Sequence, residues 1–276
     1  MPKLSRNIER QRQPYYKAAK GDVMRALKAD RMDLMERIRK CTTPEQINFE
    51  ASKQIRKDNV DKAITKVYQR TGAYFGQQTF KNLTGTKSVK RLANYQAGNV
   101  VASEDYWFAY MEKFVNQRLG NRIVWITNTT EDVFKTVCQN VTAEGIQAGL
   151  SMAEMAAKIQ TELGITEQYR AQRIAQTEVV GASNEGSHAG ASATGLDLVK
   201  EWMTSGLASV RETHAEMEGV TVGIDETFQV PTLDGTIDEM QYPGDPSGSA
   251  GNVINCHCTI GYNGAEGTSL EWGRNL

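Results

Sequence analysis

Two cysteines and a histidine occupy three consecutive positions near the C-terminal end of the sequence. Cys256 and Cys258 flank His257 in the stretch NVINCHCTIGY. In an extended strand both sulfurs would face one side and His257 the other, because side chains alternate along a strand. A disulfide between them would close a small, strained ring. Two thiolates on one side suit a soft tetrahedral ion such as Zn²⁺, so the pair predicts a metal site or, alternatively, two buried free thiols.

A metal site needs further ligands, and the sequence contains few histidines to supply them. His214, in the stretch VRETHAEMEG, is the best third candidate. The fourth position is open to Asp245 in YPGDP, to Glu216, to a water molecule, or to His257 if the local backbone is irregular. The sequence therefore predicts a metal held by His214, Cys256 and Cys258, with the fourth ligand undecided.

An enzyme is the alternative interpretation of the same residues. His214-Ala215-Glu216 forms the H-x-E that zinc nucleobase deaminases use, in which the glutamate moves protons for a zinc-bound water. The second half of that signature, P-C-x-x-C, is missing, because Asn255 precedes the first cysteine and the spacing is C-x-C. A zinc-dependent hydrolase or deaminase-like enzyme using His214, Glu216, Cys256 and Cys258 is therefore kept as the alternative to a non-enzymatic protein.

The elements that must position these residues are mostly helices. No proline occurs between residues 45 and 230, which favours helical structure. Thr43-Pro44 begins a helical period that continues to about Tyr74. Ser151 and Glu154 form a capping box, and Gly164 is expected to end the helix that follows it. Residues Ile123–Ile126 predict a short strand.

The sequence changes in character near Leu196. Short β-like runs, LDLVKEWMTS, GVTVG and TFQV, alternate there with Gly, Pro and Asp turns. The predicted fold is mainly α with a small, loop-rich C-terminal α+β module that carries the Cys/His residues. Four parts are expected: a basic helical region, 1–120; a helical central segment, 121–195; an acidic module, 196–262; and a tail, 263–276. In the central segment, the small residues after Val180 predict close packing against a neighbour.

The net charge of −1 conceals two regions of opposite sign. Residues 1–72 contain 18 Lys and Arg against 9 Asp and Glu, and residues 196–276 contain 3 against 13. The two regions either attract each other or face different partners, DNA among them. The sequence shows no secretion signal and no apolar run of about 18 residues that would span a membrane, so synthesis in a reducing cytosol is expected.

Six aromatic residues gather in two short stretches and predict either a partner interface or ordinary core. They are Tyr15, Tyr16, Tyr106, Trp107, Phe108 and Tyr110.

The ordered motifs of the C-terminal half resemble the phage Mu protein F-like minor head proteins, the phage head morphogenesis domain family. The resemblance covers roughly residues 125–262. It begins with an Ile-Ala-x-Thr-Glu helix, here Ile174, Ala175, Thr177 and Glu178. The later motif positions are Lys200, Trp202, Arg211, His214, Gly219, Glu226, Phe228, Pro243, Gly244, Asp245, Pro246, Asn255, Cys256 and Cys258. One departure is His257, where the family usually has arginine between the cysteines.

The resemblance implies a structural protein of a bacteriophage and no enzymatic activity. Proteins of this kind are low-copy head components that associate with the portal protein and enter the procapsid, with roles in DNA packaging or ejection. The implied location is the virion, in the head interior or at the portal vertex, after assembly in the host cytoplasm. Major capsid or scaffolding protein are further implied partners, and the basic N-terminal region is expected to contact DNA without sequence preference. The resemblance also favours a structural zinc at His214, Cys256 and Cys258.

Overall fold

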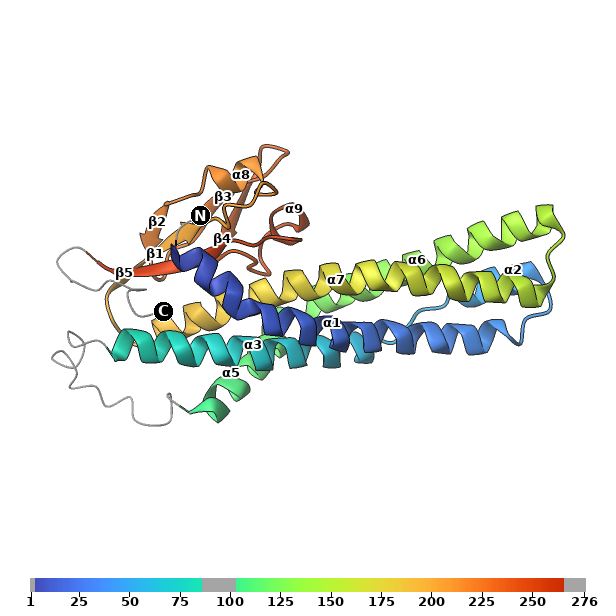
Figure 1. Ribbon diagram of the computed structural model, residues 1–276, viewed down its shortest axis with the longest axis horizontal. Helices are drawn as coiled ribbons and strands as arrows, with labels where there is room; N and C mark the ends of the chain where they lie inside the picture. Colours follow the sequence, from blue (N-terminus) through green and yellow to red (C-terminus); the bar gives the residue numbers. More distant parts are fainter. Residues whose placement is uncertain (1–2, 86–102, 266–276) are drawn as a thin grey trace. The chain divides into compact units, whose positions relative to one another are not determined.

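The computed structural model describes residues 3–85 and 103–265, and the described chain is mainly α-helical (Figure 1). The helices that precede the first strand are α1 (Lys3–Ile38), α2 (Pro44–Ala51), α3 (Asp58–Thr84), α5 (Glu104–Arg118), α6 (Gly120–Ala148) and α7 (Met152–Ser192). The C-terminal elements are β1 (Leu198–Met203), α8 (Glu212–Ala215), β2 (Thr221–Gly223), β3 (Phe228–Pro231), β4 (Ile237–Met240), α9 (Ala250–Val253) and β5 (Thr259–Gly264). This confirms the predicted fold class. None of the helices described combines the length and the apolar character needed to cross a membrane.

Both predicted helix starts are present. The Thr43 hydroxyl accepts the backbone N–H of Gln46 at the start of α2. Before α7, the Glu154 carboxylate accepts the backbone N–H of Ser151 at 2.7 Å, while the Ser151 hydroxyl accepts the N–H of Glu154 at 3.3 Å. These reciprocal bonds satisfy N–H groups that have no partner within a helix.

Three local predictions are wrong. Residues 123–126 belong to helix α6, because Ile123, Ile126 and Phe134 are buried at helical spacing and that burial outweighs β propensity. Gly164 lies inside α7, since a glycine within a helix costs only about 1 kcal/mol and the buried residues on either side continue the same face. The helix expected from 44 to about 74 is interrupted at residues 52–57, where the Glu131 carboxylate accepts the N–H of Ile55 at 2.9 Å.

The described residues form two compact units, each built from segments distant in sequence. Unit 1 draws on Met1–Ala19, Thr65–Arg118 and Ala175–Leu276, and unit 2 on Lys20–Ile64 and Leu119–Ile174. The four-part division expected from the sequence stays a prediction. Most of the predicted tail, 263–276, lies outside the described residues.

Unit 2 is a helical unit with its own apolar core. Residues from α1, α2, α6 and α7 form that core, among them Leu34, Ile47, Phe134, Cys138 and Ile159. The side-chain amide of Asn48 donates to the Thr142 hydroxyl at 3.1 Å, which ties α2 to α6. Helices of this kind gain most of their stability from the packing of one apolar face.

Five of the six clustered aromatics pack into the core of unit 1. Tyr15 and Tyr16 pack against a cluster that contains Val67 and Val179, and Trp107 is fully buried between Tyr106 and Tyr110. Phe108 is 36% exposed. The core interpretation therefore holds for all but Phe108.

Helices α3 and α7 approach each other closely in unit 1 because glycines face each other. A Cβ atom on Gly186 would lie 2.2 Å from the carbonyl oxygen of Gly72, and a Cβ on Gly190 would lie 2.4 Å from that of Gly76. Both distances are far below van der Waals contact with rigid backbone. This confirms the prediction that the small-residue end of α7 packs closely against a neighbour.

A Gly186→Ala substitution is expected to destabilise the protein by about 2 kcal/mol, because the added methyl must push two helix backbones apart. Urea unfolding of the full chain measures this. Gly21→Ala is the matched control, since its Cβ meets only the flexible end of Arg25 at 3.6 Å and alanine is the better helix former. Equal stability of the Gly186→Ala variant and the wild type would contradict the close approach.

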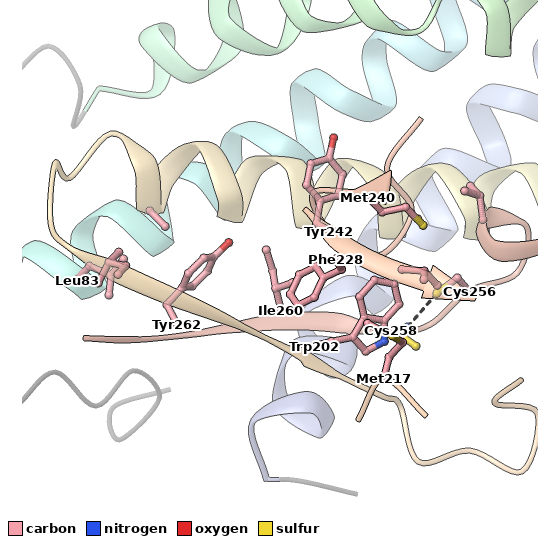
Figure 2. Close-up of a cluster of buried hydrophobic side chains, with 14 residues drawn as sticks. Leu83, Trp202, Met217, Phe228, Met240, Tyr242, Cys256, Cys258, Ile260 and Tyr262 are labelled. Atoms are coloured by element: carbon pink, nitrogen blue, oxygen red, sulfur yellow. Dashed lines mark hydrogen bonds between the residues drawn. The ribbon is translucent and has the colours of Figure 1, made fainter. Parts of the chain in front are cut away.

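The strands of unit 1 form two small antiparallel sheets. The three-stranded sheet has the order β2-β1-β5, and Trp202 on β1 pairs with Ile260 on β5. Strands β3 and β4 form a separate hairpin. Figure 2 shows the apolar cluster that these strands contribute to, with Cys256 and Cys258 at one end and Leu83 of α3 at the other. The sheets and this cluster place the two cysteines in a buried environment.

Candidate metal centre

His214, Cys256 and Cys258 converge in unit 1 although they come from separate elements. His214 lies in the short helix α8, and the cysteines lie between α9 and β5. The Nδ1 atom of His214 is 3.6 Å from the sulfur of Cys256 and 3.6 Å from that of Cys258. All three residues are buried, with exposed fractions of 1–2%. Within the described ranges, this is the one group of three or more His, Cys, Asp or Glu residues whose ligand atoms come together.

The two sulfurs face the same side, but the backbone that achieves this is a turn. Strand β5 begins only at Thr259, after the second cysteine. Asn255 has a φ of 55°, a left-handed conformation that asparagine tolerates better than most residues. The backbone N–H of Cys258 then points at the sulfur of Cys256, 3.4 Å away. The expected extended strand is therefore wrong for 256–258, while the expected direction of the sulfurs is correct.

The separations of the three donor atoms fit a tetrahedral zinc ion. With Zn–S of about 2.3 Å and Zn–N of about 2.05 Å, neighbouring sulfur and nitrogen ligands lie about 3.6 Å apart. Both sulfur–nitrogen distances here are 3.6 Å, and all three donor atoms lie within 4.8 Å of one another. Two thiols and an imidazole, buried together, are a donor set that could hold a metal ion such as zinc.

The electrostatics of the cysteine pair favour a bound cation. The neighbouring thiol of Cys258, assisted by His214, lowers the pKa of Cys256 well below that of an ordinary thiol. The contact with Cys256, together with burial, raises the pKa of Cys258 far above it. The pair therefore loses one proton readily and keeps the other. A dication beside both sulfurs would supply the charge needed to remove the second proton.

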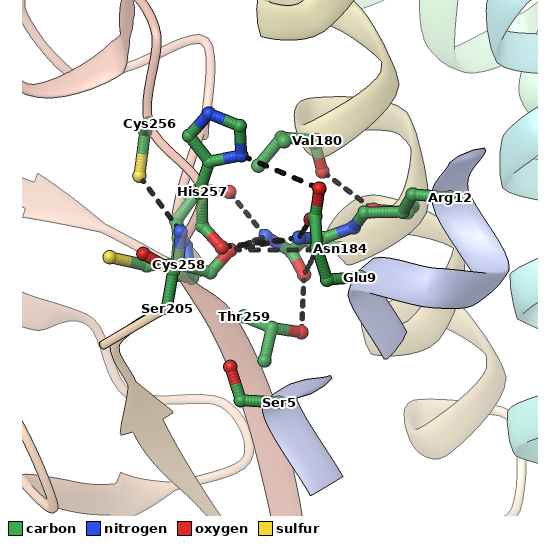
Figure 3. Close-up of polar contacts among 12 residues, drawn as sticks. Ser5, Glu9, Arg12, Val180, Asn184, Ser205, Cys256, His257, Cys258 and Thr259 are labelled. Carbon is green, nitrogen blue, oxygen red and sulfur yellow. Dashed lines mark hydrogen bonds and ion pairs between the residues drawn. The ribbon is translucent and has the colours of Figure 1, made fainter. Parts of the chain in front are cut away.

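The residues considered as fourth ligand lie elsewhere. The Asp245 carboxylate accepts the backbone N–H groups of Gln241 at 2.7 Å and Ser247 at 2.8 Å, and so closes a turn. Glu216 is exposed at the end of α8. The ring of His257 points towards Glu9 and away from the sulfurs (Figure 3). A water molecule is the candidate that the geometry leaves.

The other motif residues support the fold around the cluster. The ring of Trp202 lies 5.4 Å from that of His214 and 5.4 Å from that of Phe228, edge-on to both. The Arg211 guanidinium donates to the carbonyl of Ile254, just before the cysteines. Gly219 adopts a φ of 77°, and its N–H donates to the Trp202 carbonyl at 2.9 Å. These contacts give Trp202, Arg211 and Gly219 packing and turn-forming roles around the cluster.

The Pro243-Gly244-Asp245-Pro246 turn and Lys200 also have packing roles. Gly244 has a φ of 85° and lies against Gly181 of α7, where a side chain on Gly244 would meet backbone at 3.1 Å. Lys200 is fully buried, contacts Gln241 and lies 5.6 Å from the centre of the Phe228 ring. Burial lowers the pKa of Lys200 to about 8.

The motif in α7 contacts the cysteine turn directly. The hydroxyl of Thr177 accepts the backbone N–H of Asn255 at 3.1 Å. Glu178 accepts a hydrogen bond from the Tyr68 hydroxyl at 3.3 Å. The long helix therefore positions the turn as well as packing against α3.

The sequence analysis did not identify the N-terminal residues that hold this turn (Figure 3). Arg12 of α1 is 1% exposed and donates to Ser183 and Asn184 of α7, both at 2.8 Å. Its guanidinium also donates to the carbonyls of His257 at 3.3 Å and Cys258 at 3.5 Å. An arginine on the apolar side of an amphipathic helix, four residues after the buried Ile8, is the signal that could have revealed it.

Asn184 completes the contact between α7 and the turn. Its side-chain amide donates to the carbonyl of Cys258 at 3.0 Å and to that of Pro243 at 2.8 Å. The same side chain accepts from Arg12 and from the hydroxyl of Thr259. Three parts of unit 1, namely α1, α7 and the turn, thus share one buried polar network.

Comparison with known proteins finds a family match in the C-terminal half of the chain. Residues 136–261 match the model of the family described as Phage Mu protein F like protein, which confirms the resemblance found in the motifs. This range contains all of α7 and all three residues of the cluster, and it supports a role in phage head morphogenesis.

The chain is also similar to the "Uncharacterized protein YqbB" of Bacillus subtilis (strain 168). The two are 24% identical over 238 residues, which cover 74% of this chain and 77% of that protein. No solved structure matches the chain significantly.

Proposed function

We propose that the protein is a bacteriophage minor head protein that associates with the portal and acts in head morphogenesis. The observation that carries the proposal is the match of residues 136–261 to the Phage Mu protein F-like family. The proposed location is the virion, in the head interior or at the portal vertex, after assembly in the host cytoplasm. A role in DNA packaging or ejection belongs to the same proposal.

The cluster of His214, Cys256 and Cys258 is proposed to hold a structural zinc. The burial of all three residues and the 3.6 Å separations support this assignment. The ion would join α8 to the turn before β5, two segments about forty residues apart. The C-terminal part of unit 1 has only short strands and four-residue helices, and such a region gains much from a metal crosslink.

A metal-dependent enzyme is the less well supported alternative. Its proton carrier would be Glu216, which is exposed and outside the convergent group. The three ligand residues are buried, which gives a substrate no direct access to them. Glu216→Gln is therefore expected to leave phage infectivity unchanged, whereas an enzyme using Glu216 would lose its function.

The proposed partners are the portal protein, with major capsid or scaffolding protein as further contacts. Exposed basic side chains support an additional, sequence-independent contact with DNA phosphates. In unit 1 they include Arg6, Arg10, Lys17, Lys66 and Arg70.

Quantitative mass spectrometry of phage particles tests the proposal. Procapsids, mature heads and detergent-isolated portal complexes would be compared from phage that encode the wild-type chain and from phage with an early stop codon in its gene. The chain is expected in few copies relative to the major capsid protein and enriched with the portal. Heads and portal complexes that all lack the chain would overturn the virion role.

A further inference from the structure

Asn252 connects the candidate metal ligand His214 to the β3–β4 hairpin. Its side-chain oxygen Oδ1 lies 3.3 Å from Nε2 of His214. Its side-chain nitrogen Nδ2 donates to Asp238 Oδ2 at 2.8 Å and to the carbonyl of Pro231 at 3.2 Å. Asn252 is 3% exposed and His214 is 1% exposed, so water does not compete for these contacts.

The partners of Asn252 determine which way its amide points. The carbonyl of Pro231 only accepts hydrogen bonds. Asp238 Oδ2 already accepts two donors from Ser249, the backbone N–H at 2.8 Å and the hydroxyl at 2.7 Å, so it acts as an acceptor as well. Both therefore require the NH₂ end of the amide, which leaves Oδ1 facing His214. The usual ambiguity between amide nitrogen and oxygen is resolved by chemistry here.

The amide orientation in turn determines the tautomer of His214. Because Oδ1 of Asn252 only accepts, Nε2 of His214 must carry the proton. Nδ1 then presents its lone pair, and it is this atom that lies 3.6 Å from each sulfur. A neutral imidazole binds a metal through the nitrogen that carries no proton.

We propose that Asn252 is a positioning residue that selects Nδ1 of His214 as the metal-binding atom, and that Asp238 and Ser249 hold Asn252 in place for this role. The proposal rests on the metal site proposed above. The β3–β4 hairpin and α9 would therefore hold His214 in position, although both are distant from it in sequence.

Replacing Asn252 by leucine keeps the approximate volume and removes the acceptor. His214 would then lose the partner that favours the Nε2–H tautomer. Loss of a hydrogen-bond partner behind a metal-binding histidine typically lowers metal affinity about 10- to 100-fold. Asp238→Asn keeps an acceptor oxygen for Asn252 and is expected to have a smaller effect than Asn252→Leu.

Two measurements on the full chain test the proposal. The first is ¹⁵N NMR of the histidine rings with zinc added, in a protein whose sequence contains only three histidines. The second is zinc affinity from competition with a chelating dye, for the wild type, Asn252→Leu and Leu198→Ala. Leu198, the first residue of β1, is a buried residue of the same apolar cluster and offers no side-chain hydrogen bond, so it controls for general loosening.

The expected result is a His214 ring protonated at Nε2 and bound to zinc through Nδ1, with zinc affinity reduced 10-fold or more in Asn252→Leu and little changed in Leu198→Ala. Zinc bound through Nε2, or equal loss in both variants, would overturn the role of Asn252 and leave the metal site standing. A wild type that binds no zinc would overturn the metal site, and the role of Asn252 with it. The NMR arm needs only the wild type, so it decides the question even if Asn252→Leu does not fold.

Discussion

Replacing Cys256 by serine is expected to remove the bound zinc and to lower the melting temperature of the protein by about 10–20 °C. Zinc contributes about 10 kcal/mol to the folding of small zinc-binding peptides. About half of that free energy is expected to be lost here, because the apolar cluster around Trp202 and Phe228 contributes stability without the ion. For a unit of this size, each kcal/mol shifts the melting temperature by about 2–4 °C.

Elemental mass spectrometry of protein purified without a histidine tag measures the metal, and calorimetry with and without a chelator measures the stability. About one zinc per wild-type chain is expected, with none in Cys256→Ser or His214→Ala. Cys41→Ser is the matched control, because Cys41 is half-buried in unit 2 and is not part of the group that converges on His214. A wild type without metal, whose melting does not respond to the chelator, would show that the two thiols are ordinary core residues.

Arg12→Ala is expected to destabilise the protein by about 4 kcal/mol, although Arg12 lies more than 240 positions from the cysteines in sequence. A hydrogen bond from a charged donor contributes about 1.5–3 kcal/mol, and each buried acceptor left without a donor costs about 1–3 kcal/mol. Removing the guanidinium abolishes the two 2.8 Å bonds to Ser183 and Asn184 and takes the Arg12 donor from the carbonyl of His257. The Cys258 carbonyl keeps its bond from Asn184, and the Asn184 oxygen keeps its bond from Thr259.

Urea unfolding and the zinc content of the same samples would measure the effect. Arg10→Ala is the control: Arg10 lies on the same helix, is exposed and bonds only to the nearby Asn7, so its loss is expected to cost less than about 0.5 kcal/mol. Arg12→Lys keeps the charge but lacks the planar fork, and an intermediate loss is expected. Similar stability of the Arg12→Ala and Arg10→Ala variants would mean that the network does not stabilise the turn.

Sequence-based predictions were correct where a residue type has one well-defined structural role. Thr43 and Ser151 mark helix starts because their hydroxyls satisfy free N–H groups, and the small residues of α7 mark a close helix crossing. The convergence of His214 with the two cysteines also followed from residue type and motif order. These features need little knowledge of the rest of the chain.

The sequence was least informative where distant packing decides the outcome. Ile123 and Ile126 have β propensity, but their burial in unit 2 makes them helical. Gly164 ends no helix because the apolar face continues past it. The roles of Arg12 and Asn252 depend on which side chains meet in the folded chain. Helical spacing places Arg12 on an apolar face, but it does not identify the partners of either residue. The hairpin residues Pro231 and Asp238, for example, have no pattern that connects them to His214.

The hydrogen bonds from Arg12 can form only late in translation. The guanidinium emerges near the beginning of synthesis, but the carbonyls of His257 and Cys258 follow 245 and 246 residues later. At about 5–20 residues per second, a ribosome needs about 12–50 s to cover that distance. During this interval the first turns of α1 hold a charged group on a side that the finished protein buries. The first turns of α1 therefore complete their packing only when β5 has left the ribosome, and a truncated product would leave Arg12 without its acceptors in the cysteine turn.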